Sequence, residues 1–102
     1  MKKSKLAKSC DISPKVKREV AERDNGCCII CGQKGSPNGH YISRAQLGLG
    51  IPENIVTLCD KCHYRLDQTT ERENLLAVVK GYLKVHYPNF TDEQRKYHKG
   101  DL

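Results

Sequence analysis

Residues 54–63, NIVTLCDKCH, join a short run of apolar and β-branched residues to a pair of cysteines. The run predicts a strand at residues 54–58. The spacing of Cys59 and Cys62 predicts a metal knuckle, in which two thiolates lie on one side of a tight turn. The same spacing occurs once more, nearer the N-terminus. Two knuckles supply the ligands of a tetrahedral site, so we expect a structural zinc ion held by Cys28, Cys31, Cys59 and Cys62.

The length and composition of the chain favour a structural cross-link such as this zinc site. The chain has 102 residues, 37% of them hydrophobic, and a domain of this size usually needs a disulfide or a metal ion besides its core. The N-terminal residues contain no signal-peptide h-region, and no segment approaches the length of a membrane span. We therefore expect a cytoplasmic protein with no membrane partner, where thiols stay reduced and bind metal. A redox CxxC is the alternative, but two copies in matched contexts argue against it, and Cys10 and Cys27 are left over as bystanders.

The chain is basic, with a formal net charge of +6 and a pI near 9.1. Basic side chains bind nucleic acid because they displace the counterions condensed on its phosphates. DNA is therefore the expected partner, although a solvated basic surface would have the same composition.

Helices and short strands are expected to alternate along the chain. Ser13 and Pro14 predict an N-cap and a first helical turn, and residues 24–26 end that helix. A polar loop is expected over residues 33–38, followed by a short strand over residues 40–43. The second strand, at residues 54–58, then leads through the second knuckle into a further helix.

A long amphipathic helix is expected over residues 71–86, because Thr70 and Glu73 have the spacing of a capping box. Its apolar positions should cover the core, namely Leu75, Leu76, Val78, Val79, Tyr82 and Leu83. A weaker helical turn is expected within residues 91–98.

Three segments follow from these patterns. Residues 1–12 are expected to form a flexible basic tail, residues 13–90 the folded domain, and residues 91–102 a C-terminal extension. The predicted class is α+β, with helices flanking the domain on its N- and C-terminal sides.

Three further residues occur in a fixed order between and after the knuckles, namely His40, Asn54 and His63. Together with the cysteines, the segments GHYISR at residues 39–44 and NIVTLC at residues 54–59 resemble the zinc-containing branch of the HNH endonucleases. The resemblance covers roughly residues 20–68. It implies a ββα-metal fold, also called a His-Me finger, stapled by the four-cysteine zinc site.

The resemblance also implies a role for each of the three residues. His40 takes the place of the general base, which activates water to attack the scissile phosphate. Asn54 takes the place of the Asn that braces the loop and orients the base. His63 takes the place of a ligand to the catalytic divalent metal.

The chemistry requires such groups whatever the family. Phosphodiester hydrolysis needs a neutral imidazole to accept a proton from water and a cation to stabilise charge on the phosphate. Asp67 lies four residues after His63, so the two side chains project from one face of a helix. Together they could bind Mg²⁺, Mn²⁺ or a softer ion such as Ni²⁺.

The sequence departs from the family at one position. Many members carry Asp or His as a further metal ligand immediately before the base, whereas this chain has Gly39. Either Asp67 supplies the second ligand, or the register shifts so that His40 is the ligand and Tyr41 takes the place of the base. The family's His-x-x-x-Arg spacing from His40 to Arg44 favours the first alternative.

Contacts to DNA are expected from Arg44, close to the base, and from Lys61 and Arg65, on the helix that carries the metal ligand. For each of them, an ordinary solvated or ion-paired surface residue is the alternative. His86, His98 and the remaining tyrosines are expected to be outside the site.

Three functions are compatible with the sequence. The first is a DNA endonuclease of little sequence preference, which nicks one strand or, as a homodimer, cuts both. The second is a non-catalytic zinc-ribbon module that binds nucleic acid, for which His40, Asn54 and His63 would have no use. The third is a nuclease for branched DNA. Short HNH proteins of this kind resemble those of bacteriophages and prophages, which implies a bacterial cytoplasm and possible packaging (terminase) partners.

Overall fold

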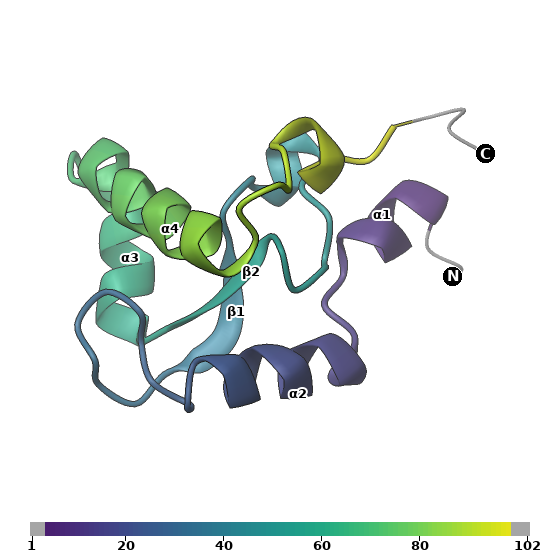
Figure 1. The fold of residues 1–102 in the computed structure, drawn as a ribbon. Coiled ribbons are helices and arrows are strands. Elements are labelled where there is room, and N and C mark those ends of the chain that lie inside the picture. Colours follow the sequence, from purple (N-terminus) through teal and green to yellow (C-terminus); the bar gives the residue numbers. More distant parts are fainter. Residues whose placement is uncertain (1–3, 99–102) are drawn as a thin grey trace.

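The structure is a computed structural model that describes residues 4–98. It has the predicted α+β class, with one two-stranded antiparallel sheet and helices around it (Figure 1). The elements in chain order are α1 (Lys5–Cys10), α2 (Pro14–Arg23), β1 (Ser36–His40), η1 (Arg44–Gln46), β2 (Ile55–Leu58), α3 (Asp60–Gln68), α4 (Arg72–His86) and η2 (Glu93–Arg95).

The two strands form the centre of the molecule. Ser36 pairs with Leu58 and His40 with Ile55, with an irregularity in the register between these pairs. All four residues of β2 are buried, as its apolar sequence predicts. The expectation of a first strand at residues 40–43 was wrong, because β1 begins four residues earlier, inside the expected loop. Its composition, SPNGH, has low strand propensity, so pairing with buried β2 rather than local preference determines its extent.

Helices lie on both sides of the sheet. In Figure 1, α2 runs below the strands, and α4 crosses above them beside α3. The core includes Tyr41 after β1, Val56 and Leu58 of β2, and Leu75, Val79 and Leu83 of α4. One predicted core position is wrong, because Val78 is 47% exposed.

The long helix begins without the predicted capping box. Glu71 is the N-cap of α4 and forms no side-chain capping bond. The hydroxyl of Thr69, not that of Thr70, accepts a hydrogen bond from the Glu71 N–H at 3.2 Å. The N-terminus of α4 therefore has a hydrogen bond from the connection to α3 in place of the predicted pair of Thr70 and Glu73.

The segment expected to be a flexible tail contains a helix. Ser4 caps α1, and its hydroxyl accepts from the Ala7 N–H at 3.1 Å. The end of α1 is attached to the rest of the protein, because Cys10 is buried and the Gly50 N–H donates to the Ser9 carbonyl at 2.9 Å. Within the described residues of the predicted tail, residues 4–12 thus belong to the fold.

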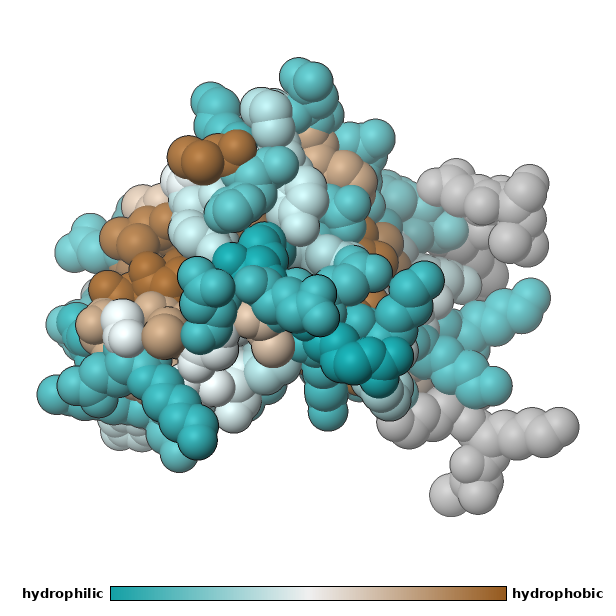
Figure 2. Space-filling model, turned by 60° about the horizontal axis from the view of Figure 1, so that its bottom comes forward, coloured by the Kyte–Doolittle hydropathy of each residue, from teal (hydrophilic) through white to brown (hydrophobic). Residues whose placement is uncertain are grey.

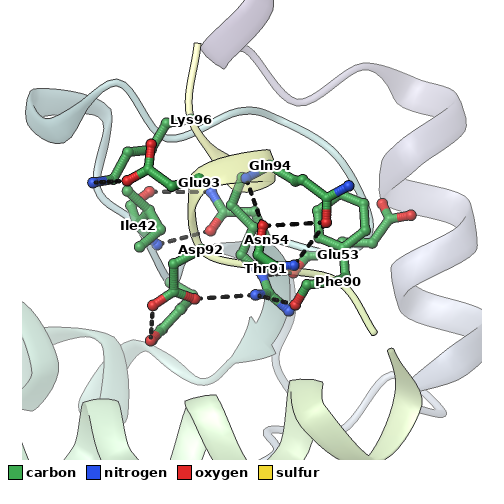
Figure 3. A network of polar contacts seen from close by, with 11 residues as sticks. Ile42, Glu53, Asn54, Phe90, Thr91, Asp92, Glu93, Gln94 and Lys96 are labelled. Carbon is green, nitrogen blue, oxygen red and sulfur yellow. Dashed lines mark hydrogen bonds and ion pairs between the residues drawn. The ribbon is translucent and has the colours of Figure 1, made fainter. Parts of the chain in front are cut away.

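The predicted C-terminal extension also packs against the domain (Figure 3). Arg95 is 4% exposed, and its guanidinium donates to the carbonyls of Glu53 and Phe90 and to the Asp92 carboxylate. The backbone of residues 95–97 pairs with that of residues 47–49. The part of this segment that the structure describes therefore stabilises the loop before β2.

A buried ion pair joins α2, β2 and α4. Arg23 and Asp24 are paired, and the Asp24 carboxylate also accepts from the Thr57 N–H and the Tyr82 hydroxyl. Burial alone would raise the pKa of Asp24, but these hydrogen bonds and the Arg23 charge outweigh it and hold that pKa below its ordinary value. The Arg23 guanidinium also donates to the carbonyls of Pro52 and Ile55.

Across residues 4–98, none of the helices combines the length and the apolar character needed to cross a membrane.

The buried ion pair predicts a large stability effect. Asp24→Asn is expected to lower the free energy of unfolding by about 3 kcal/mol, because removing one partner leaves the other charge buried and uncompensated. Urea unfolding of the metal-loaded protein at pH 7 measures this, with the exposed Glu22→Gln as the matched control. Equal unfolding midpoints for the two variants would show that the ion pair does not stabilise the fold.

Candidate metal centre and candidate active site

The four predicted cysteine ligands converge on one point. Their sulfur atoms all lie within 4.8 Å of one another, and the Sγ atoms of Cys31 and Cys59 are 3.6 Å apart. All six cysteines are free thiols, and Cys10 and Cys27 are not in this cluster. Four thiols in this arrangement could hold a metal ion such as zinc. The predicted ligand set is Cys28, Cys31, Cys59 and Cys62.

Local backbone geometry brings the two knuckles together. The first knuckle closes where the Gly32 N–H donates to the Cys28 carbonyl at 2.8 Å, with Gly32 at a φ of +82° that favours glycine. The second lies at the start of α3, where Cys59 is the N-cap. A hydrogen bond of 3.0 Å from the Ile29 N–H to the Thr57 carbonyl links the first knuckle to β2.

The pKa values of Cys28 and Cys62 are shifted in opposite directions. Burial raises the pKa of Cys28, but backbone N–H groups that include those of Cys31 and Cys59 outweigh it and lower that pKa to about 7. Burial and the neighbouring cysteines raise the pKa of Cys62 to about 12. Thiols this close cannot all ionise without a cation among them, so the cluster suits a divalent metal.

Two of the expected DNA-binding residues lie near this cluster. Arg65 forms a two-point ion pair with Glu71, at 2.8 and 2.9 Å, and one of its nitrogen atoms is 3.9 Å from the Cys62 sulfur. Lys61 is exposed in the first turn of α3. Neither residue lines the pocket described next.

A pocket of about 590 Å³ lies between β1, the loop that follows it, α3 and the start of α4. It brings together three residues that the sequence singled out, His40, His63 and Asp67, with the expected DNA contact Arg44. The remaining lining residues are Ile12, Asn38, Ser43, Ala45, Gln68 and Arg72. Imidazole, carboxylate and guanidinium groups thus face one solvent-open space.

His63 and Asp67 form a pair on one face of α3. The Nε2 atom of His63 lies 3.0 Å from the Asp67 carboxylate, as the spacing of four residues predicts. Arg72 lies 3.7 Å from the other oxygen of Asp67. An imidazole and a carboxylate at this separation could share one divalent cation.

His40 is held by a backbone carbonyl. Its Nε2 atom lies 2.8 Å from the carbonyl oxygen of Cys10, and since a carbonyl only accepts, Nε2 carries the hydrogen and Nδ1 is the free acceptor. Burial lowers the pKa of His40 from its ordinary 6.5 and the charge of Arg44 lowers it further, while the Cys10 carbonyl and the Asp11 charge only partly oppose this. His40 is therefore a neutral imidazole with an available lone pair at neutral pH.

Asn54 lies outside the pocket and braces the loop that follows β1 (Figure 3). It is fully buried, and its side-chain oxygen accepts from the Ile42 N–H at 2.8 Å. Its amide nitrogen donates to the carbonyls of Ile42 and Leu49. These bonds tie the residues after His40 to the segment before β2.

The surroundings of residues 39–41 distinguish the two alternatives, in which either His40 or Tyr41 takes the place of the base. A Cβ atom at Gly39 would lie 2.5 Å from a methyl carbon of Leu58, so this position faces the core, with no room for a ligand. Tyr41 is also buried, and its hydroxyl donates to Asp92 at 3.2 Å, away from the pocket. Of the three neighbours, His40 alone lines the pocket with His63.

Sequence reasoning missed Arg72, Asn38 and Gln68 in this pocket. Gln68 follows Asp67 on α3, and its position could have been found from the helix. Arg72 reaches Asp67 only because the chain turns sharply between α3 and α4, for which local spacing gives no signal. No protein-family model matches the chain, and no curated protein matches it, so the site rests on its own geometry.

The cysteine cluster predicts a specific response to loss of one thiol. Sites of this kind contribute on the order of 10 kcal/mol to the folding of small domains, so Cys59→Ser is expected to lose both bound metal and cooperative unfolding. Co²⁺ titration, followed by thiolate-to-metal absorption, and thermal unfolding measure the two effects. Cys27→Ser is the matched control and should bind one Co²⁺ at the cysteine cluster, with the same thiolate-to-metal absorption as wild type. A folded Cys59→Ser protein with native metal content would contradict this assignment.

Proposed function

We propose that the protein is a metal-dependent DNA endonuclease of the HNH type, in which the four-cysteine cluster holds a structural zinc ion. The observation that carries the proposal is the shared pocket lined by His40, His63 and Asp67. A zinc ribbon that only binds nucleic acid needs the four cysteines, but it has no use for two histidines and a carboxylate in one solvent-open space. The hydrogen bonds of Asn54 to the backbone of Ile42 and Leu49 support the bracing role proposed for it from the HNH resemblance.

His40 is proposed as the general base. With Nε2 engaged by the Cys10 carbonyl, the Nδ1 lone pair accepts a proton from water. The water oxygen then bonds to the phosphorus atom as the bond to the leaving oxygen breaks. The lowered pKa of His40 keeps it in the base form at neutral pH.

His63 and Asp67 are proposed to bind the catalytic divalent cation, for which Mg²⁺, Mn²⁺ and Ni²⁺ are candidates. Such an ion, when bound, stabilises negative charge on the phosphate and the leaving oxygen. Arg72 lies next to Asp67. When the Asp67 carboxylate binds a cation, the Arg72 guanidinium is released from that pair and can contact a phosphate oxygen. In this proposal Asp67 is the second protein ligand, in place of the ligating side chain that is missing at Gly39.

DNA is proposed as the substrate because the chain carries a net charge of +6 and Arg44 and Arg72 flank the pocket. Hydrophilic residues cover most of the face shown in Figure 2, while hydrophobic residues gather at its left. We extend the proposal to a phage or prophage protein in the bacterial cytoplasm that acts beside DNA-packaging proteins. One site cuts one strand, so double-strand cleavage would require a homodimer or a second encounter with the DNA.

The activity is testable on supercoiled plasmid. Zinc-loaded wild type with Mg²⁺, Mn²⁺ or Ni²⁺ is expected to nick the plasmid, and His40→Ala to be slower by at least ~100-fold, the usual contribution of a general base. His98→Ala, in a histidine outside the pocket, is the matched control. Because the pKa of His40 lies below 6.5, the base form persists, and the rate should hold, as the pH falls to that value. Equal rates for wild type and His40→Ala in all three metals would refute the proposal and favour the binding module.

The catalytic metal shell has its own test. Asp67→Ala is expected to weaken Mn²⁺ binding by the zinc-loaded protein by about tenfold or more, because a carboxylate ligand is lost. Electron paramagnetic resonance of free Mn²⁺ measures the affinity, and Glu73→Ala, in an exposed carboxylate on α4, is the control. An unchanged Mn²⁺ titration in Asp67→Ala would remove this residue from the metal shell.

A further inference from the structure

The C-terminal end of α1 lies against the candidate active site. The carbonyl oxygen of Cys10, the last residue of α1, accepts from His40 Nε2 at 2.8 Å and from Arg44 at 3.0 Å. Arg44 also pairs with the Asp11 carboxylate at 2.5 Å, and Ile12 lines the pocket. Residues 9–12, here called the N-terminal strap, therefore form one wall of the site.

The strap has a physical reason to bind at this place. The last carbonyls of a helix have no partner within the helix, and the last two of α1 accept hydrogen bonds from the end of β1, from η1 and from the segment before β2. The Ser9 carbonyl accepts from the Gly50 N–H at 2.9 Å. The Cys10 carbonyl accepts from a histidine and an arginine, and donors of this kind are favoured at helix C-termini.

We propose that the N-terminal strap positions the His40 imidazole for catalysis, so that docking of the strap is required for the activity proposed above. The Cys10 carbonyl fixes the ring through Nε2 and leaves Nδ1 as the atom that accepts the proton from water. Without the strap, the ring would be free to rotate and to exchange tautomers. Positioning of a reacting group of this kind commonly determines rate, since small misplacements of a catalytic group are costly.

Gly50 provides a way to undock the strap without touching the pocket. A Cβ atom at Gly50 would lie 2.0 Å from the Asp11 carbonyl oxygen and 3.1 Å from that of Cys10. These are backbone atoms, so Gly50→Ala displaces the strap itself. Gly81, on α4, has open space where a methyl group would be added, with nothing within 4 Å, which makes Gly81→Ala the matched control.

The experiment combines nicking kinetics with the tautomer of His40 in zinc-loaded protein labelled with ¹⁵N-histidine. Long-range ¹H–¹⁵N spectra above pH 7 should show the neutral Nε2–H tautomer of His40 in wild type and in Gly81→Ala. In Gly50→Ala we expect a mixture of tautomers and a nicking rate lower by at least about tenfold. Asp11→Ala, which removes the Arg44 pair without a steric clash, should give a smaller change of the same kind.

Each outcome decides for or against the strap. A single Nε2–H tautomer in Gly50→Ala, with or without loss of nicking, would overturn the positioning role, as would a wild-type His40 that carries its hydrogen on Nδ1. If Gly50→Ala does not fold or bind zinc, Asp11→Ala decides by the same two measurements. If wild type nicks no DNA, the proposed function fails, yet the tautomer spectra still show whether the strap fixes His40.

Discussion

The convergence of four cysteine thiols is the constraint on which the rest of the structure depends. The first pair lies after α2 and the second at the start of α3, so a metal ion among them would join two segments that flank the sheet. Such an ion would add to the packing of Leu66 against α4 in fixing the direction of α3. That direction matters because His63 follows directly after Cys62, and the helix carries it to the side of the sheet where His40 ends β1.

Two buried networks of polar side chains, around Asp24 and around Asn54, also hold the elements of the fold together. Asp24, with Arg23, Tyr82 and the backbone of β2, joins α2 to β2 and α4. Asn54 holds the loop after β1 against the segment before β2 through three hydrogen bonds. Buried polar groups of this kind are costly unless they are fully paired, and here their partners fix α2 against β2 and the residues after His40 against the segment before β2.

The sequence predicted the parts of the fold that local chemistry determines. The N-cap at Ser13, the buried strand at β2, the CxxC knuckles and the helix bearing His63 and Asp67 all follow from spacing and propensity. The predictions from sequence were wrong for segments whose structure depends on contacts with distant parts of the chain. β1 has the composition of a loop and is a strand only because β2 lies beside it, and residues 4–12 looked like a tail because their fold depends on partners far along the chain.

The same distinction between local patterns and long-range contacts applies to the residues of the candidate site. His40, His63 and Asp67 were found from motif order and helix spacing. Arg72 and the Cys10 carbonyl were not found. The turn between α3 and α4 brings Arg72 to the pocket, and the end of α1 brings the Cys10 carbonyl there. Gly39 looked like a missing ligand in the sequence, whereas its contact with Leu58 gives a packing reason for glycine.

The most direct measurement is anomalous diffraction from crystals of the zinc-loaded protein grown with Mn²⁺. We expect two separate metal positions, with zinc among the four cysteine sulfurs and manganese bound by His63 and Asp67, facing Nδ1 of His40. A manganese ion bound away from His63, or zinc alone with the pocket free of metal at saturating Mn²⁺, would contradict the proposed two-metal arrangement.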